Sequence, residues 1–141
     1  MNSLIVCVDA SIVIDHLIRP EDLQLHTLWE SWGEADTQLV APALLRYEAT
    51  NALFQKVKKG QLTLGTTSEL VRVMLALPVQ LYTDLELHTR AFQIAQELSL
   101  GATYDAYYLA LADQLQCELW TRNAKLTRAA SQKYSWVKLL D

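Results

Sequence analysis

A short apolar run near the start of the chain is closed by a single carboxylate. Residues 4–8 are all apolar, three of them Val or Ile, and Asp9 follows. This pattern predicts a strand that is buried on both faces of a sheet. Open α/β sheets bind ligands outside the carboxyl ends of their strands, so Asp9 occupies a position where chemistry is common. The alternative is that Asp9 only caps the helix that follows, and this stretch alone does not separate the two interpretations.

The remainder of the chain alternates between strand and helix patterns. Apolar spacing predicts helices over residues 11–17, 21–34, 42–58, 69–77, 84–98, 103–112 and 124–132. Short apolar runs predict further strands over residues 38–41, 79–82, 118–121 and 136–140. Two local signals mark helix starts: Pro42 at a first helical position, and a capping box of Thr66 with Glu69. Such alternation predicts an α/β fold with a mostly parallel sheet, covered on both faces and joined by right-handed crossovers.

The composition is that of one globular domain spanning residues 1–141. The chain is 51% hydrophobic, and no apolar run approaches the roughly 20 residues needed to cross a bilayer. We expect no signal peptide and no membrane contact. Cys7 and Cys117 lie in apolar segments without metal-ligand or redox spacing, so we expect reduced core thiols in a cytoplasmic protein.

Charge is distributed unevenly along the chain. The net charge of −4 argues against a protein that coats nucleic acid by bulk attraction. Residues 122–141 nevertheless carry a balance of +4, against −8 for the rest. Arg122, Lys125 and Arg128 in this segment are therefore candidates for contact with an RNA backbone. The alternative is that they form a solvated helix face.

Glu48 lies on the apolar stripe of the helix predicted over residues 42–58. At roughly 100° per residue it falls between Leu44 and Ala52, on the side that faces the core. A carboxylate there costs several kcal/mol unless an opposite charge or hydrogen bonds compensate it. Arg46 lies two positions away, where helical side chains do not face each other. A metal ion would compensate the charge, and a buried ion pair is the alternative.

Four oxygen-bearing side chains are expected at one edge of the sheet. Asp9 and Asn123 each follow a strand, whereas Glu48 and Asp105 lie on helices that begin near that edge. Asp105 by itself could simply answer the positive end of its helix dipole, with Thr103 as N-cap. Three carboxylates at close range repel unless a divalent cation lies among them, and oxygen ligands select Mg²⁺ or Mn²⁺. Such a site suits phosphodiester hydrolysis.

The segments at residues 8–11, 47–53, 103–112 and 119–123 resemble those of PIN-domain ribonucleases, and within them the VapC-type toxins of bacterial toxin–antitoxin pairs. The likeness covers essentially the whole chain, and the order and spacing of the segments are more specific than any one of them. It implies a three-layer α/β/α sandwich with a five-stranded parallel sheet. It also implies metal-dependent endoribonuclease activity, a homodimer, and inhibition by a small VapB-type antitoxin.

By position, the resemblance makes Asp9, Glu48 and Asp105 the metal-binding acids. It makes Ser11 and Thr121 the hydroxyls that orient those acids. Asn123 departs from the family pattern, which usually has a fourth acid at that place. An amide oxygen can ligate a cation but adds no charge, so we expect one firmly held Mg²⁺ or Mn²⁺ ion and a weakened second position.

Other protein classes also place an Asp after the first strand, but the residues around Asp9 do not fit them. A phosphatase of the haloacid dehalogenase type needs an acid two positions after Asp9, where this chain has Ser11. A response-regulator receiver needs adjacent acids after the first strand and a later lysine, and neither is present. A PIN-like RNA-binding or regulatory module that no longer cleaves remains the alternative, with Asn123 as its sign.

Several further residues receive structural interpretations. Asp15 and Asp113 are predicted to be peripheral to the site. The aromatic side chains on helical stripes are predicted to be core rather than base-stacking surfaces: Trp29, Trp32, Tyr107 and Tyr108. The helix predicted over residues 69–77 is apolar on nearly every side, so either the core or another subunit must cover it, and we expect a contact between subunits there.

Overall fold

A five-stranded parallel sheet forms the centre of the computed structural model, which describes residues 4–141. Its strands are β1 (Ile5–Val8), β2 (Gln38–Pro42), β3 (Val79–Tyr82), β4 (Glu118–Thr121) and β5 (Val137–Leu139). They pair in the order β3-β2-β1-β4-β5, every pair parallel. The predicted α/β class and five-stranded parallel sheet are confirmed.

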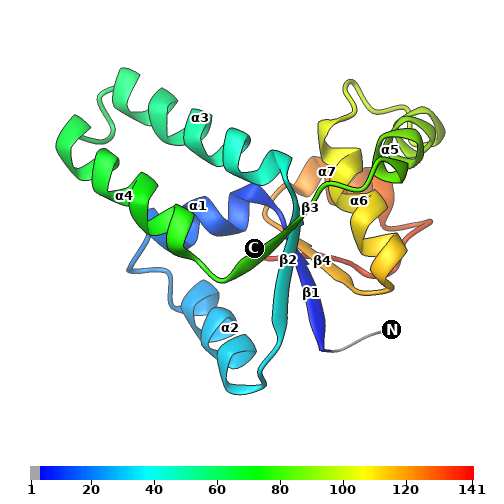
Figure 1. Cartoon of the computed structure of the whole chain (residues 1–141), viewed down its shortest axis with the longest axis horizontal. Helices are drawn as coiled ribbons and strands as arrows, with labels where there is room; N and C mark the ends of the chain where they lie inside the picture. Colours follow the sequence, from blue (N-terminus) through cyan, green and yellow to red (C-terminus); the bar gives the residue numbers. More distant parts are fainter. Residues whose placement is uncertain (1–3) are drawn as a thin grey trace.

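Seven helices within residues 4–141 cover the two faces of this sheet. One face carries α1 (Ala10–Ile18), α2 (Leu23–Glu34), α3 (Leu44–Lys58) and α4 (Leu64–Ala76); the other carries α5 (Glu86–Glu97), α6 (Tyr104–Leu115) and α7 (Ala124–Ala130) (Figure 1). The chain runs outward from β1 to β3 and then returns across the other face to β4. The topological switch point therefore lies between β1 and β4, where an open parallel sheet binds its ligands.

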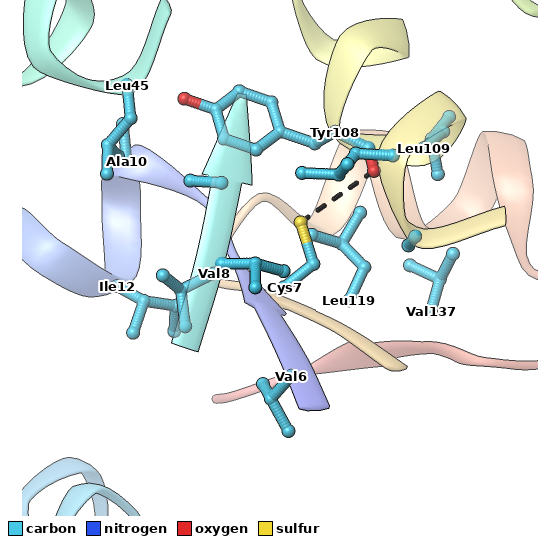
Figure 2. Close-up of a cluster of buried hydrophobic side chains, with 14 of the residues drawn as sticks. Val6, Cys7, Val8, Ala10, Ile12, Leu45, Tyr108, Leu109, Leu119 and Val137 are labelled. Atoms are coloured by element: carbon cyan, nitrogen blue, oxygen red, sulfur yellow. Dashed lines mark hydrogen bonds between the residues drawn. The ribbon is translucent and has the colours of Figure 1, made fainter. Parts of the chain in front are cut away.

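The core is centred on β1 and on α6, which packs across β1, β2 and β4. Cys7 and Val8 on β1 and Tyr108 on α6 are all completely buried. The Cys7 Sγ–H donates to the backbone carbonyl of Tyr108 at 3.8 Å. Figure 2 shows the Tyr108 ring lying among these apolar side chains, with its hydroxyl turned toward α3. A buried tyrosine hydroxyl needs a polar partner, and the site described below supplies it.

Two predicted helix starts are wrong. Pro42 is the last residue of β2, and the Ala43 N–H donates to the Tyr82 carbonyl at 3.0 Å, so α3 begins two residues after Pro42, at Leu44. The N-cap of α4 is Thr63, whose hydroxyl accepts from the Thr66 N–H at 3.3 Å. The Thr66–Glu69 capping box therefore does not form, because residues 64–66 are already helical.

Two further predictions concern burial. Cys7 and Cys117 are both free and buried, as expected. On α4, Val73 and Leu75 each remain 49% exposed, so the fold of one chain leaves part of this apolar helix uncovered. Among residues 4–141, no helix has both the length and the apolar character needed to cross a membrane.

Candidate active site

Asp9 follows β1 at the switch point and is held by two hydroxyls. Its Oδ2 accepts hydrogen bonds from Ser11 Oγ at 2.7 Å and from Thr121 Oγ1 at 2.9 Å. Each hydroxyl is itself oriented by a backbone N–H, that of Arg122 to Ser11 and that of Asn123 to Thr121, both at 3.0 Å. Both hydroxyls donate to Oδ2. The Oδ1 atom accepts no hydrogen bond from residues 4–141.

The capping interpretation of Asp9 fails on the same geometry. Asp9 occupies the N-cap position of α1, but its side chain makes no capping hydrogen bond. The residue is only 6% exposed. A carboxylate that the adjacent helix does not use, and that β4 helps to hold rigidly, is available for another role.

Glu48 lies in the second turn of α3, partly buried, and its partner is Tyr108. The Tyr108 hydroxyl donates to Glu48 Oε1 at 2.6 Å. Within residues 4–141 no cation pairs with Glu48, and Arg46 instead donates to the Leu75 carbonyl at 3.4 Å. Burial raises the pKa of Glu48, and Asp9 and Asp105 raise it further, against the opposing effect of the Tyr108 hydrogen bond. The predicted alternative of a buried ion pair is therefore absent.

Asp105 is the second residue of α6 and is also partly buried. Its pKa is raised, first by burial and then by the charge of Asp9. A carboxylate placed there only to answer the helix dipole would be stabilised in its charged form. Burial and the neighbouring charge of Asp9 instead favour the neutral form of Asp105. Thr103 occupies the N-cap position but makes no side-chain cap.

A cleft of about 540 Å³ joins these acids to α7. Glu48, Asp105 and Asn123 line it, together with Lys125 and Tyr104, while Asp9 lies deeper. The charge of Asp9 raises the pKa of both Glu48 and Asp105, and that of Asp105 also raises the pKa of Glu48. In the part of the chain that the structure describes, however, no three acidic, His or Cys side chains are grouped closely enough to hold a metal ion. The acids share one edge of the sheet without closing into a ligand set.

Asn123 uses its amide oxygen within the fold. It is the N-cap of α7, and its Oδ1 accepts the Leu126 N–H at 3.0 Å. An aspartate could cap the helix with one oxygen and offer the other to a cation. The asparagine has a single oxygen, which the cap already uses, and an NH₂ group that donates hydrogen bonds and cannot ligate a cation. In this arrangement the cleft gains a donor where the family usually has an acid.

The predicted RNA-contacting residues separate into two kinds. Lys125 is exposed and lines the cleft, and Arg128 is exposed on α7. Arg122 instead pairs through Nε with Asp15 at 3.1 Å and through Nη1 with Asp22 at 2.8 Å, with its side chain 18% exposed. The guanidinium of Arg122 is thus committed to α1 and α2, which removes it from the candidate RNA surface.

The acids predicted to be peripheral are paired with arginines. Asp15 contacts both Arg19 and Arg122, and Asp113 lies 3.5 Å from Arg90. Lys133 in the basic segment pairs with Glu97 at 2.6 Å. The +4 balance of residues 122–141 therefore does not form one continuous basic surface.

Two tyrosines near the acids were not predicted as site residues. Tyr108 is core, as expected, but its hydroxyl also holds Glu48. Its position three residues after Asp105 places the two on one side of α6, a signal that could have identified it. Tyr104 is 61% exposed at the cleft and was not singled out. Tyr107 is half-buried and Trp32 is in the core.

Comparisons with known proteins complete this description. A search of curated proteins found no match to the chain. The family model of the PIN domain matches residues 6–132, which include β4, all of β1 but its first residue, and all the acids of the site. PIN domains are generally nucleases that use divalent metals, and the strand order and carboxylate edge seen here fit that chemistry. The chain belongs to the PIN domain family.

Proposed function

We propose that this protein is a metal-dependent endoribonuclease with Asp9, Glu48 and Asp105 as its acidic residues. One observation carries the proposal. Three carboxylates from three separate elements lie at the switch-point edge of the sheet, none of them paired with a cation among residues 4–141, and burial and neighbouring carboxylates raise the pKa of Glu48 and Asp105. A fold does not maintain such a cluster for stability, because it is more stable without the repulsion.

The donor set fits Mg²⁺ or Mn²⁺ by its chemistry. Carboxylate oxygens are the ligands that hard divalent cations prefer, and Asp9 Oδ1, Glu48 and Asp105 would hold the ion. When bound, such an ion supplies neutralising charge to a phosphate and lowers the pKa of a water molecule. The Oδ1 atom of Asp9 accepts no hydrogen bond from residues 4–141 and is therefore free for this purpose.

The chain's own side chains prepare the site for a phosphodiester. Ser11 and Thr121 fix Asp9, and the Tyr108 hydroxyl fixes Glu48, so two of the three acids are oriented before any ligand arrives. Lys125 lies in the same cleft, where its ammonium group can bind a phosphate oxygen. Because Asn123 offers no second oxygen, the proposal includes one firmly held ion rather than two.

The wider biological role belongs to the same proposal. The resemblance to VapC-type toxins supports the toxin of a type II toxin–antitoxin pair, with a small antitoxin as its partner. The exposed apolar side chains of α4, Val73 and Leu75, support a homodimer formed through that helix. The substitution Val73→Glu should convert the dimer to a monomer in light scattering. Free, buried Cys7 and Cys117 support a reducing, cytoplasmic location.

A non-cleaving RNA-binding module is the second candidate, and Asn123 favours it. Its amide oxygen is used in the α7 cap, so the cleft has one acid fewer than the family pattern. This candidate requires RNA binding without turnover at any metal concentration.

RNA cleavage by the purified protein separates the two candidates. The wild-type protein should cleave single-stranded RNA internally in Mg²⁺ or Mn²⁺, and EDTA should stop it. The Asp9→Asn variant should retain its fold by circular dichroism and lose cleavage. If the protein binds RNA but yields no cleavage products under any metal condition, the non-cleaving module replaces the nuclease as the proposed function. Cleavage that persists in both EDTA and Asp9→Asn would reject the site.

A further inference from the structure

A second pocket, of about 320 Å³, lies beside the cleft at the carboxyl ends of β2 and β3. Its walls come from the residue that ends β2, the segment after β3, and the first turns of α3, α5 and α6. The residues that line it include Leu44, Thr83, Asp84, His88, Tyr104 and Tyr107. Nothing in the proposed hydrolysis uses this pocket.

The pocket and the cleft are neighbours, since Tyr104 lines both of them. On α3, Leu44 of the pocket is one helical turn before Glu48 of the cleft. On α6, Tyr107 of the pocket is one turn after Tyr104. Along α3 the pocket is therefore about one helical pitch, a rise of roughly 5.4 Å, from Glu48.

Aromatic rings and a few polar groups give the pocket its chemistry. The rings of His88 and Tyr107 are 5.3 Å apart, edge to face, and His88 Nδ1 is hydrogen-bonded to the Tyr107 hydroxyl at 2.7 Å. Asp84 already accepts from Gln114 at 3.0 Å through Oδ2. No Lys or Arg lines the pocket. The lining thus offers ring faces and hydrogen-bonding edges but no site for a phosphate.

We propose that this pocket binds an unpaired nucleobase of the RNA, adjacent to the phosphate that enters the carboxylate cleft. The inference rests on the proposed function, because it takes RNA as the substrate. A base stacks on the exposed face of Tyr104, and its edge meets the polar groups of His88 and Asp84. Aromatic stacking of unpaired bases is the common way in which proteins bind single-stranded RNA.

Binding of RNA to the inactive Asp9→Asn protein tests this subsite without cleavage. The probes are fluorescently labelled octaribonucleotides of A, C and U, followed by anisotropy in Mg²⁺. Adding Tyr104→Ala should weaken binding about five- to hundredfold, the usual loss when a stacking ring is removed. Tyr104→Phe should retain binding. Phe92→Ala removes another exposed aromatic, on α5 outside the pocket, and should have no effect.

Two further measurements distinguish the pocket from the cleft. Thr83 is exposed and lines only the pocket, so Thr83→Trp should fill the pocket and weaken RNA binding as Tyr104→Ala does. The dependence of affinity on salt should be unchanged in both variants, since no phosphate contact is lost. In Lys125→Ala one phosphate contact is lost, so the slope of log affinity against log salt should instead become shallower by about one.

Each outcome decides the inference. It is overturned if Tyr104→Phe binds as weakly as Tyr104→Ala, if Thr83→Trp binds RNA normally, or if the Asp9→Asn protein does not bind RNA. Normal RNA binding by Thr83→Trp would point to an apolar side chain of a protein partner as the occupant. Absence of cleavage by the wild-type protein, with the Tyr104 and Thr83 effects intact, would reject the nuclease proposal alone and leave the base subsite standing.

Discussion

Two groups of acidic side chains lie next to each other in this molecule, and only one of them is paired with arginines. The carboxylate cluster consists of Asp9, Glu48 and Asp105; the arginine cluster consists of Asp15, Asp22, Arg19 and Arg122. The two are adjacent in sequence as well, since α1 begins after Asp9 and contains Asp15. At the end of β4, the Thr121 hydroxyl donates to Asp9 and the next side chain, Arg122, pairs with Asp15.

The pKa shifts in the two clusters have opposite signs. The pKa of Asp22 is lowered, chiefly by the Leu25 N–H that it accepts and then by Arg122 and Arg19. The pKa values of Glu48 and Asp105 are raised by burial and by neighbouring acids. Where the fold needs an acid, it provides a cation or a backbone donor. In the carboxylate cluster, no acid forms an ion pair with a cation among the described residues.

The largest expected effect is on activity when one acid of the carboxylate cluster loses its charge. Glu48→Gln keeps the size of the side chain and an oxygen for the Tyr108 hydroxyl. We expect RNA cleavage to fall by at least about a hundredfold, because even residues that only support a metal ligand contribute about 10–100-fold. Cleavage rate and Tm are measured on the same preparation.

Stability should not follow activity in this variant. Removing a repelled charge leaves the Tm of Glu48→Gln equal to that of the wild type or above it. A Tm that falls together with activity would mean that Glu48 is a structural residue, and the contrast between the clusters would disappear.

The second prediction concerns the arginine cluster. Asp15→Asn leaves Arg122 and Arg19 without one of their carboxylates, and Asp15 is only 17% exposed. We expect the free energy of unfolding to fall by about 1–3 kcal/mol, measured by urea denaturation. The matched control is Glu69→Gln, which breaks an ion pair that is 71–80% exposed and should cost less than about 0.5 kcal/mol. Equal losses in the two variants would contradict the structural role of the cluster.

The third prediction connects the core to the carboxylate cluster. Tyr108→Phe removes only the hydroxyl that donates to Glu48. We expect Mn²⁺ affinity and the rate of cleavage to fall about tenfold, because Glu48 is no longer held in place. Tyr107→Phe is the control for Mn²⁺ affinity, since its hydroxyl binds His88 in the neighbouring pocket and no carboxylate of the cluster. An unchanged Mn²⁺ affinity in Tyr108→Phe, measured by calorimetry, would show that the hydroxyl only satisfies a buried polar group.

The sequence predicted the carboxylate cluster better than the arginine cluster, for a physical reason. Asp9 and Glu48 are marked by local patterns, a strand end and a helical stripe, which need no knowledge of distant segments. The partners of Arg122, Asp15 and Asp22, lie 100 or more residues away and are decided by how α1 and α2 pack against β4. Pattern alone therefore placed Arg122 on an RNA surface.

The start of α4 shows the same limit at short range. The Thr66–Glu69 pair matches a capping box, but the structure caps the helix at Thr63. Thr67 is 5% exposed and its hydroxyl donates to the Thr63 carbonyl at 2.6 Å, whereas residues 64–66 are exposed. Burial of the Thr67 side chain favours the earlier cap, and the Thr66–Glu69 motif does not contain this information.

The fourth prediction returns an acid to the carboxylate cluster. In Asn123→Asp, one oxygen can keep the α7 cap while the other faces the cleft, so the site gains a ligand and a negative charge. We expect a second Mn²⁺ ion to bind several-fold more tightly, measured by calorimetric titration. Asn51→Asp, an exposed position on α3 outside the cleft, controls for added charge alone. Equal titration curves for Asn123→Asp and the wild type would count against a second ion position beside α7.

The smallest effect is a difference in sign between the clusters as pH changes, measured as Tm in EDTA. Asp22 has a lowered pKa, so its charge stabilises the fold above its ordinary pKa of about 3.9 and this contribution is lost as pH falls through the lower, folded value. Asp22→Asn, which can still cap α2, should lower Tm at pH 7 and match the wild type near pH 2.

Asp105 has a raised pKa, so its ionised form destabilises the fold once pH exceeds that value. Asp105→Asn should raise Tm by about 2 °C at pH 7 and lose this gain below about pH 4. Shifts of the same sign at pH 7 would mean that both clusters are structural, and the carboxylates at the switch point would then need a cation that belongs to the fold itself.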